Sequence, residues 1–219
     1  DTSVTSEAVM ADPGLVIHES RVIDLSKIDV EGLRQEIHTA QYKPIEIDDL
    51  RAFIEKALNQ MINRNCTRIK FSERYRGIID RYNAGGTENE DYYEQLVELI
   101  NEMKQEDNRA AAEGLTEEEL EIYDLLMAGK KLTKADEQKV KLSAKHLYQK
   151  LTANRENLLV VDWYKDEQPK SKVKTAIEES LDSDLPDCYD KTSFRSKIDL
   201  LMNHFIDMAV QGYGWIGAA

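Results

Sequence analysis

Residues 116–127 read TEEELEIYDLLM, and this stretch contains the two patterns that decide the fold. Thr116 and Glu119 have the spacing of a capping box, in which two side chains satisfy backbone N–H groups left free at a helix start. An apolar face at helical spacing follows: Leu120, Tyr123 and Leu126. Together the two patterns predict an amphipathic helix, which Gly129 ends.

The same pairing of cap and stripe recurs along the chain. Thr87 with Glu90 and Thr133 with Asp136 have the capping-box spacing, and each precedes an apolar stripe. Gly85 and Gly86 end the helix before the first of these boxes, and Asp48 is a candidate cap for an earlier helix. The stripes predict helices over residues 33–40, 50–61, 71–82, 88–112, 117–127, 134–151, 171–181 and 192–209.

We therefore predict a predominantly all-α fold, an irregular array of about seven or eight helices. Residues 1–25 have no clear periodicity and are predicted to be an extended arm or linker, and residues 26–219 a helical domain. The exception is the short, β-branched run at 158–163, which predicts an extended segment packed across helices. Its Trp163 is expected to be buried, with the indole N–H bonded to an acceptor.

Size and composition limit the possibilities. The chain has 219 residues, enough for one large domain or two small ones with a core that needs no disulfides. A net charge of −13 opposes wrapping of nucleic acid, which requires a local excess of cations. Two cysteines, Cys66 and Cys188, predict free thiols in a reducing cytoplasm. The sequence contains no apolar run long enough to predict a membrane span. Because it begins without Met, we expect it to be a piece of a longer protein.

Enzyme motifs are not found. No Gly-x-x-x-x-Gly-Lys-Ser/Thr loop is present to hold nucleotide phosphates. Asp162, Glu167 and Lys170 imitate the carboxylates and lysine of a Mg²⁺-dependent nuclease, but the spacing is wrong and a proline interrupts the run. His204 and Asp207 are helical neighbours, although no second His or Cys near them in sequence completes a zinc site. The sequence predicts no catalytic, cofactor-binding or metal-binding residue.

Charge is segregated along the chain. Six cations gather in one short region, with only two acids among them: Arg64, Arg68, Lys70, Arg74, Arg76 and Arg81. Fourteen acids follow between residues 88 and 124, and seven lysines between residues 130 and 150. One interpretation is solvated helix faces that pair across the fold. The other is a partner-binding surface, for which the six cations, here called the basic island, are the candidates.

Three short stretches in order resemble a known family. They are Phe71-Ser72-Glu73 running into Arg81-Tyr82-Asn83, the acidic helix start at 113–126, and Val161-Asp162-Trp163. Together they resemble the helical C-terminal region of the restriction (motor) subunit of type I restriction-modification enzymes, over roughly residues 45–215. The resemblance implies that residues 26–219 are a helical C-terminal assembly domain without its own catalytic site.

The resemblance also implies the molecular context. The parent subunit would be a bacterial, cytoplasmic, ATP-dependent DNA translocase and endonuclease that uses ATP and Mg²⁺, whereas this fragment would need no cofactor. Its partners would be the modification and specificity subunits of the methyltransferase core, with DNA contacted through the whole complex. Two alternatives stay open: a helical DNA-binding domain that places the basic island on phosphates, and a stand-alone adaptor that binds a partner helix.

Overall fold

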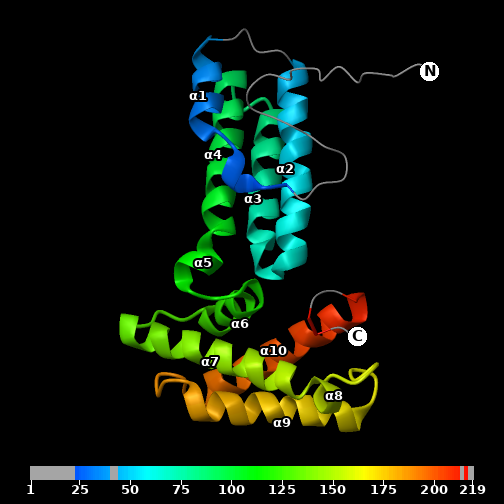
Figure 1. Cartoon of the computed structure of the whole chain (residues 1–219). Coiled ribbons are helices and arrows are strands. Elements are labelled where there is room, and N and C mark those ends of the chain that lie inside the picture. Colours follow the sequence, from blue (N-terminus) through cyan, green and yellow to red (C-terminus); the bar gives the residue numbers. More distant parts are fainter. Residues whose placement is uncertain (1–22, 40–43, 213–214, 217–219) are drawn as a thin grey trace, which may run out of the picture. The chain divides into compact units, whose positions relative to one another are not determined.

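The computed structural model describes residues 23–39, 44–212 and 215–216. It is 79% helical, and the described residues contain ten α-helices, two short 3-10 helices and no strand (Figure 1). The all-α prediction is confirmed. The predicted arm at 1–25 lies almost entirely outside the described residues. Within the described ranges, no helix is both long and apolar enough to span a membrane.

The chain forms two compact units and passes between them three times. Unit 1 comprises residues 1–60 and 70–108, and unit 2 comprises residues 61–69 and 109–219. The segment 61–69 therefore belongs to unit 2, although both of its neighbours in sequence belong to unit 1. We call residues 61–69 the connector.

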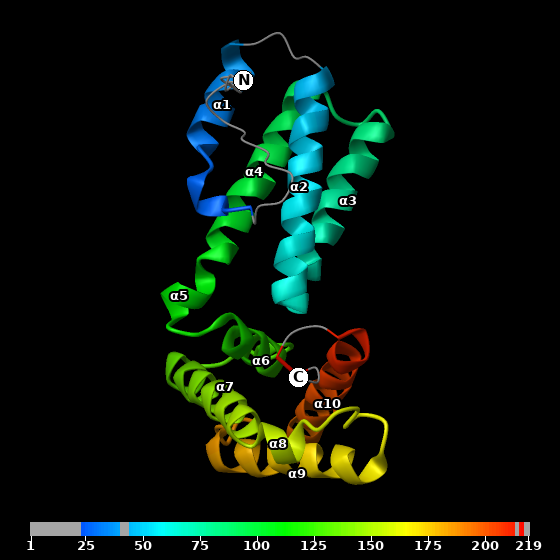
Figure 2. The same cartoon turned by 45° about the vertical axis from the view of Figure 1, so that its right-hand side comes forward.

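Unit 1 is built of long helices that lie side by side in both views (Figures 1 and 2). The 3-10 helix η1 (Leu25–Lys27) leads into α1 (Val30–Thr39), which packs on α4 (Asn89–Asp107). The bodies of α2 (Pro44–Arg64) and α3 (Ile69–Asn83) complete the unit. Its core contains the predicted apolar stripes, including Ile54, Tyr75 and Leu96.

Several predicted helix ends in unit 1 are wrong. Helix α2 begins at Pro44, not after Asp48, because proline suits the first turn, where its missing N–H is not needed. Helix α4 begins at Asn89 with Glu88 as N-cap and no side-chain bond, so Thr87 does not form the predicted box. The same helix ends at Asp107, short of the predicted residue 112.

Unit 2 packs three long helices and several short elements around one core. Besides the connector's 3-10 helix η2 (Cys66–Arg68), it contains α5 (Arg109–Glu113), α6 (Glu117–Met127), α7 (Lys134–Ala153), α8 (Arg155–Leu158), α9 (Glu167–Asp184) and α10 (Lys191–Gln211). Helix α7 packs against α6 and α9, and α10 packs against the same two helices. Fully buried side chains such as Leu120, Leu147 and Phe205 form the core.

Of the two capping boxes predicted in unit 2, the one at Thr116 is complete, and at Thr133 only the bond to the N-cap side chain forms. The Thr116 hydroxyl accepts a hydrogen bond from the backbone N–H of Glu119 at 3.2 Å, and Glu119 accepts one from the Thr116 N–H at 2.9 Å. Thr133 likewise accepts from the N–H of Asp136. Helix α6 is followed by Gly129 at φ 71°, a left-handed conformation that glycine adopts without a steric penalty.

The predicted extended segment at 158–163 is wrong. Residues 155–158 form helix α8, and a turn follows in which the Trp163 N–H donates to the Val160 carbonyl at 2.9 Å. Asp162 has φ 58°, which bends the chain so that Trp163 turns inward while Val161 stays 73% exposed. The prediction for Trp163 is confirmed: its ring is fully buried, and its indole N–H donates to the Ile216 carbonyl.

Candidate functional site

The six cations of the basic island do not share one environment. Arg64 and Arg68 belong to unit 2, at the end of α2 and in η2, whereas the other four lie on α3 in unit 1. Sequence proximity grouped residues that the fold assigns to two units.

Arg68 is an internal residue. Its side chain is fully buried, and its guanidinium pairs with the Glu117 carboxylate in the first turn of α6 at 2.8 Å. A guanidinium removed from water in this way stabilises the attachment of the connector to α6 and is not available as a partner contact. Arg68 is therefore not a suitable candidate for the exposed partner-binding surface.

The four cations on α3 are exposed, and three have partners within unit 1. Arg74 pairs with Glu102, Lys70 lies 3.9 Å from the Glu106 carboxylate, and Arg81 donates to the Gln95 side-chain oxygen at 2.9 Å. Arg76 is exposed and makes no hydrogen bond or ion pair with the described part of the chain. Contacts with residues of the acidic segment 88–124 therefore explain the positions of Lys70, Arg74 and Arg81. They do not explain Arg76.

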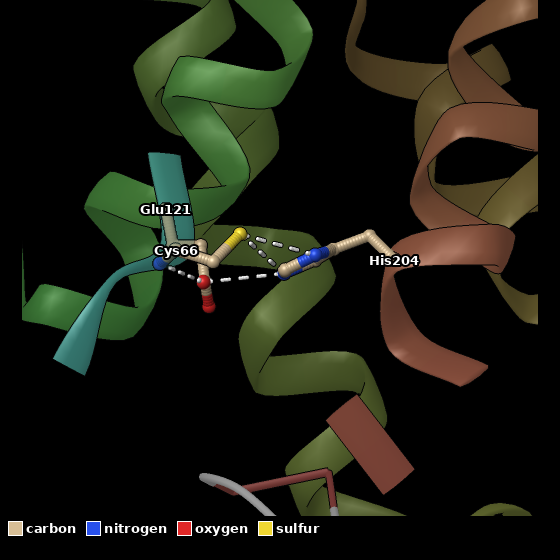
Figure 3. Close-up of side chains that lie close together, drawn as sticks. All are labelled: Cys66, Glu121 and His204. Atoms are coloured by element: carbon tan, nitrogen blue, oxygen red, sulfur yellow. Dashed lines mark hydrogen bonds and ion pairs between the residues drawn. The ribbon is translucent and has the colours of Figure 1, made fainter. Parts of the chain in front are cut away.

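A cluster of three polar side chains lies inside unit 2 (Figure 3). Cys66 comes from the connector, Glu121 from α6 and His204 from α10. The Cys66 sulfur lies 3.4 Å from Nδ1 and 3.9 Å from Nε2 of His204, and His204 Nε2 lies 3.2 Å from Glu121 Oε1. We call these residues the Cys–Glu–His cluster. Its members are up to 138 residues apart in sequence.

Local structure explains how the cluster is positioned. Asn65 caps η2 by accepting hydrogen bonds from the N–H and hydroxyl of Thr67, which turns Cys66 toward α6. The Cys66 N–H then donates to Glu121 Oε1 at 3.1 Å. Because the Glu121 side chain is only 2% exposed, its carboxylate is held by these contacts and not by water.

The surroundings disfavour nucleophilic chemistry at Cys66. Burial, together with the negative charges of Glu121 and Asp207, raises the pKa of this thiol from 9.0 to about 12. A thiol is nucleophilic only as a thiolate, and reactive cysteines lie in electropositive surroundings. The geometry resembles a Cys–His pair, but the electrostatics keep the proton on sulfur.

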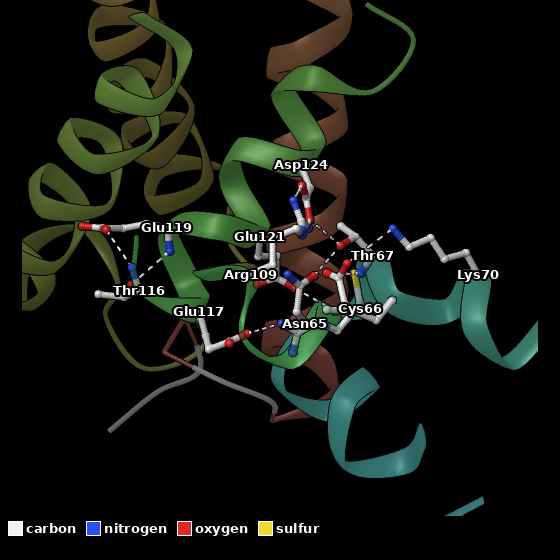
Figure 4. Close-up of polar contacts among 12 residues, drawn as sticks. Asn65, Cys66, Thr67, Lys70, Arg109, Thr116, Glu117, Glu119, Glu121 and Asp124 are labelled. Carbon is white, nitrogen blue, oxygen red and sulfur yellow. Dashed lines mark hydrogen bonds and ion pairs between the residues drawn. The ribbon is translucent and has the colours of Figure 1, made fainter. Parts of the chain in front are cut away.

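A second polar network, next to this cluster, attaches the connector to α6 (Figure 4). The Thr67 hydroxyl oxygen lies 3.0 Å from the Asp124 carboxylate on α6, and Arg109 donates to both oxygens of the same carboxylate. With Arg68–Glu117 and Cys66–Glu121, three successive connector residues contact α6. The network connects the connector, α5 and α6 within unit 2.

The remaining residues that imitate catalytic groups have local roles. Lys170 pairs with Glu167 in the first turn of α9, and Asp162 pairs with Lys165 in the preceding turn. His204, grouped with Asp207 from sequence, contacts Cys66 and Glu121. Sequence reasoning missed Cys66 and Glu121 because nothing in the residues around either one indicates a partner so distant along the chain.

The fold and these contacts define a class of protein: an all-α region of two units whose polar clusters hold helices together. Residues 3–208 match the family described as type I restriction enzyme HindI endonuclease subunit-like, C-terminal. The chain belongs to this family.

A curated relative agrees with this assignment. The chain is 28% identical over 155 residues, 70% of its length, to the protein named putative type I restriction enzyme MjaIXP endonuclease subunit of Methanocaldococcus jannaschii. The matched stretch spans only 14% of that relative. No solved structure is significantly similar to this chain.

Proposed function

We propose that this chain docks the restriction subunit of a type I enzyme onto its methyltransferase core, made of modification and specificity subunits. The observation that supports this most is the match of residues 3–208 to the C-terminal region of an endonuclease subunit family. ATP-dependent translocation and cleavage of cytoplasmic DNA would belong to other parts of that subunit.

A non-catalytic role for this region is consistent with its sequence and side chains. The sequence contains no phosphate-binding loop, and the residues that imitate a nuclease are engaged in local ion pairs. The purified chain is expected to hydrolyse no ATP and to cut no DNA in the presence of Mg²⁺. Nucleotide hydrolysis that a point change within the chain removes would contradict this.

The exposed part of the basic island is the surface we assign to docking. Arg76 and Arg81 lie on α3, and neither is neutralised by an ion pair within the described residues. In a chain of net charge −13, such cations would orient an acidic surface of the core during encounter. Arginine suits bidentate contact with carboxylates better than lysine does.

Charge reversal in the whole restriction subunit tests this surface. Arg76→Glu with Arg81→Glu should slow association with the purified core about tenfold at low salt, and added salt should reduce the difference, because exposed charges act on the encounter rate. Lys134→Glu with Lys139→Glu on α7 is a control with the same change in net charge, because both lysines are exposed.

The outcomes are distinguishable. Slowing by the α3 pair alone supports docking through this surface. Equal slowing by both pairs indicates an effect of net charge only, and no slowing by either excludes the α3 surface. If the α3 pair instead weakens binding of the subunit to free DNA and leaves binding to the core unchanged, the cations serve a DNA-binding domain.

A further inference from the structure

The Cys–Glu–His cluster places three different metal-binding atoms close together inside unit 2. The Cys66 sulfur, one Glu121 oxygen and one His204 ring nitrogen all lie within 4.8 Å of one another. They come from the connector, α6 and α10, so the cluster connects three separate elements (Figure 3). Thiolate, imidazole and carboxylate are the three side-chain ligands that zinc uses in proteins.

We propose that Cys66, Glu121 and His204 bind a single Zn²⁺ ion that fastens the connector to α6 and α10. With ordinary zinc–ligand distances, a tetrahedral ion separates sulfur from nitrogen by about 3.5 Å and nitrogen from oxygen by about 3.4 Å. The corresponding separations to His204 Nε2 are 3.9 Å and 3.2 Å. Both separations are within about 0.4 Å of the values for a bound ion.

The charges around the cluster favour a cation. The Glu121 carboxylate is buried, and Asp207 follows His204 by one turn along α10. Both groups oppose a bare thiolate, because they would place negative charges together. A divalent ion reverses this effect: it stabilises the thiolate, and the thiol proton leaves to solvent on binding.

The proposed site has three protein ligands and therefore leaves a fourth tetrahedral position open to water. The site is assembled from residues far apart in the chain, so binding requires the folded arrangement of unit 2, and the ion stabilises that arrangement in return. The inference concerns the stability of unit 2 and does not depend on the docking role.

Cobalt provides a direct probe, because Co²⁺ substitutes for Zn²⁺ and absorbs light when a thiolate binds it. The chelator-treated full chain is titrated with Co²⁺ and then with Zn²⁺. We expect a thiolate-to-cobalt charge-transfer band at one ion per chain, which Zn²⁺ abolishes, and a higher melting temperature with Zn²⁺. Cys66→Ser should remove the band, and His204→Gln should weaken binding at least tenfold.

Cys188→Ser is the matched control, because Cys188 is the other cysteine and is exposed. This variant should retain both the band and the stabilisation. The proposal is overturned if the parent chain shows no band, if the band depends on Cys188, or if Cys66→Ser binds Zn²⁺ as tightly as the parent. Circular dichroism of each variant verifies that the chain is folded, and the near-isosteric Cys66→Ser change keeps the test decisive if His204→Gln unfolds.

Discussion

The Arg74–Glu102 pair of unit 1 and the Arg68–Glu117 pair of unit 2 differ in their exposure to water. Both partners of the first pair are partly exposed, at 47% and 29%, whereas the Arg68 side chain of the second is fully buried. The difference extends to each unit as a whole. Among the described residues, seven of the eight buried polar or charged side chains belong to unit 2, and Glu106 alone belongs to unit 1.

The comparison shows that the units use charge differently. In unit 1 the helices bury apolar stripes and leave nearly all charged side chains in water, where ion pairs contribute little. Unit 2 also buries charged side chains, and some of them satisfy backbone groups left free where helices begin and end. In unit 2, the buried amine of Lys197 donates to the carbonyls of Leu125 and Ala128 at the end of α6, at 2.7 and 2.6 Å.

The largest expected effect is at Trp163 in unit 2. Replacing this fully buried ring by alanine should cost about 3–5 kcal/mol, because it leaves a cavity and an unpaired carbonyl at Ile216. Chemical denaturation with both units monitored would check the value. An unchanged unfolding midpoint would show that the ring does not hold unit 2 together.

The two ion pairs provide a direct test of the comparison. Arg68→Met should cost about 3 kcal/mol, since it leaves the Glu117 carboxylate beside a buried apolar side chain. Arg74→Met removes an exposed pair and should cost less than about 1 kcal/mol. Equal losses in urea unfolding would contradict the distinction between the units.

The start of α6 in unit 2 has a side-chain cap, whereas the start of α4 in unit 1 has none. Thr116→Ala should cost about 1 kcal/mol, because it removes the acceptor for the Glu119 N–H at the start of α6. Glu88→Ala at the start of α4 should change stability by less than about 0.5 kcal/mol, since Glu88 makes no side-chain capping bond. Calorimetry of the two variants checks both values. A loss at Glu88 as large as at Thr116 would mean that unit 1 also depends on its caps.

The smallest effect is a dependence on alkaline pH. The pKa of Cys66 is raised from 9.0 to about 12 by burial and nearby carboxylates, so above pH 9 the folded chain retains a proton that the unfolded chain loses. Stability should therefore fall as pH rises from about 9 toward 12. After chelator treatment, the free energy of unfolding should fall less steeply with pH for Cys66→Ser than for Cys188→Ser. The difference in slope should correspond to at most one bound proton. Identical slopes would show that Cys66 titrates normally.

Local sequence patterns predicted the existence of the long helices well, but predicted less well the residues at which the helices begin and end. The stripes located the long helices because burial of one face depends only on spacing along the chain. Thr116 and Thr133 cap their helices as predicted, but Thr87 does not, since the N-cap of α4 is Glu88, one residue later. The 158–163 run failed because its composition favours strands, whereas the left-handed Asp162 makes it a turn.

By itself, the sequence determined the all-α class, the helix stripes, the burial of Trp163 and, through three ordered motifs, the family. All of these depend on residues near one another in the chain or on matched patterns. Only the tertiary structure assigned the connector to unit 2, separated Arg68 from the other cations and joined Cys66 to Glu121 and His204. Contacts between residues 55 to 138 positions apart leave no local periodicity, because they depend on how already formed helices pack against one another.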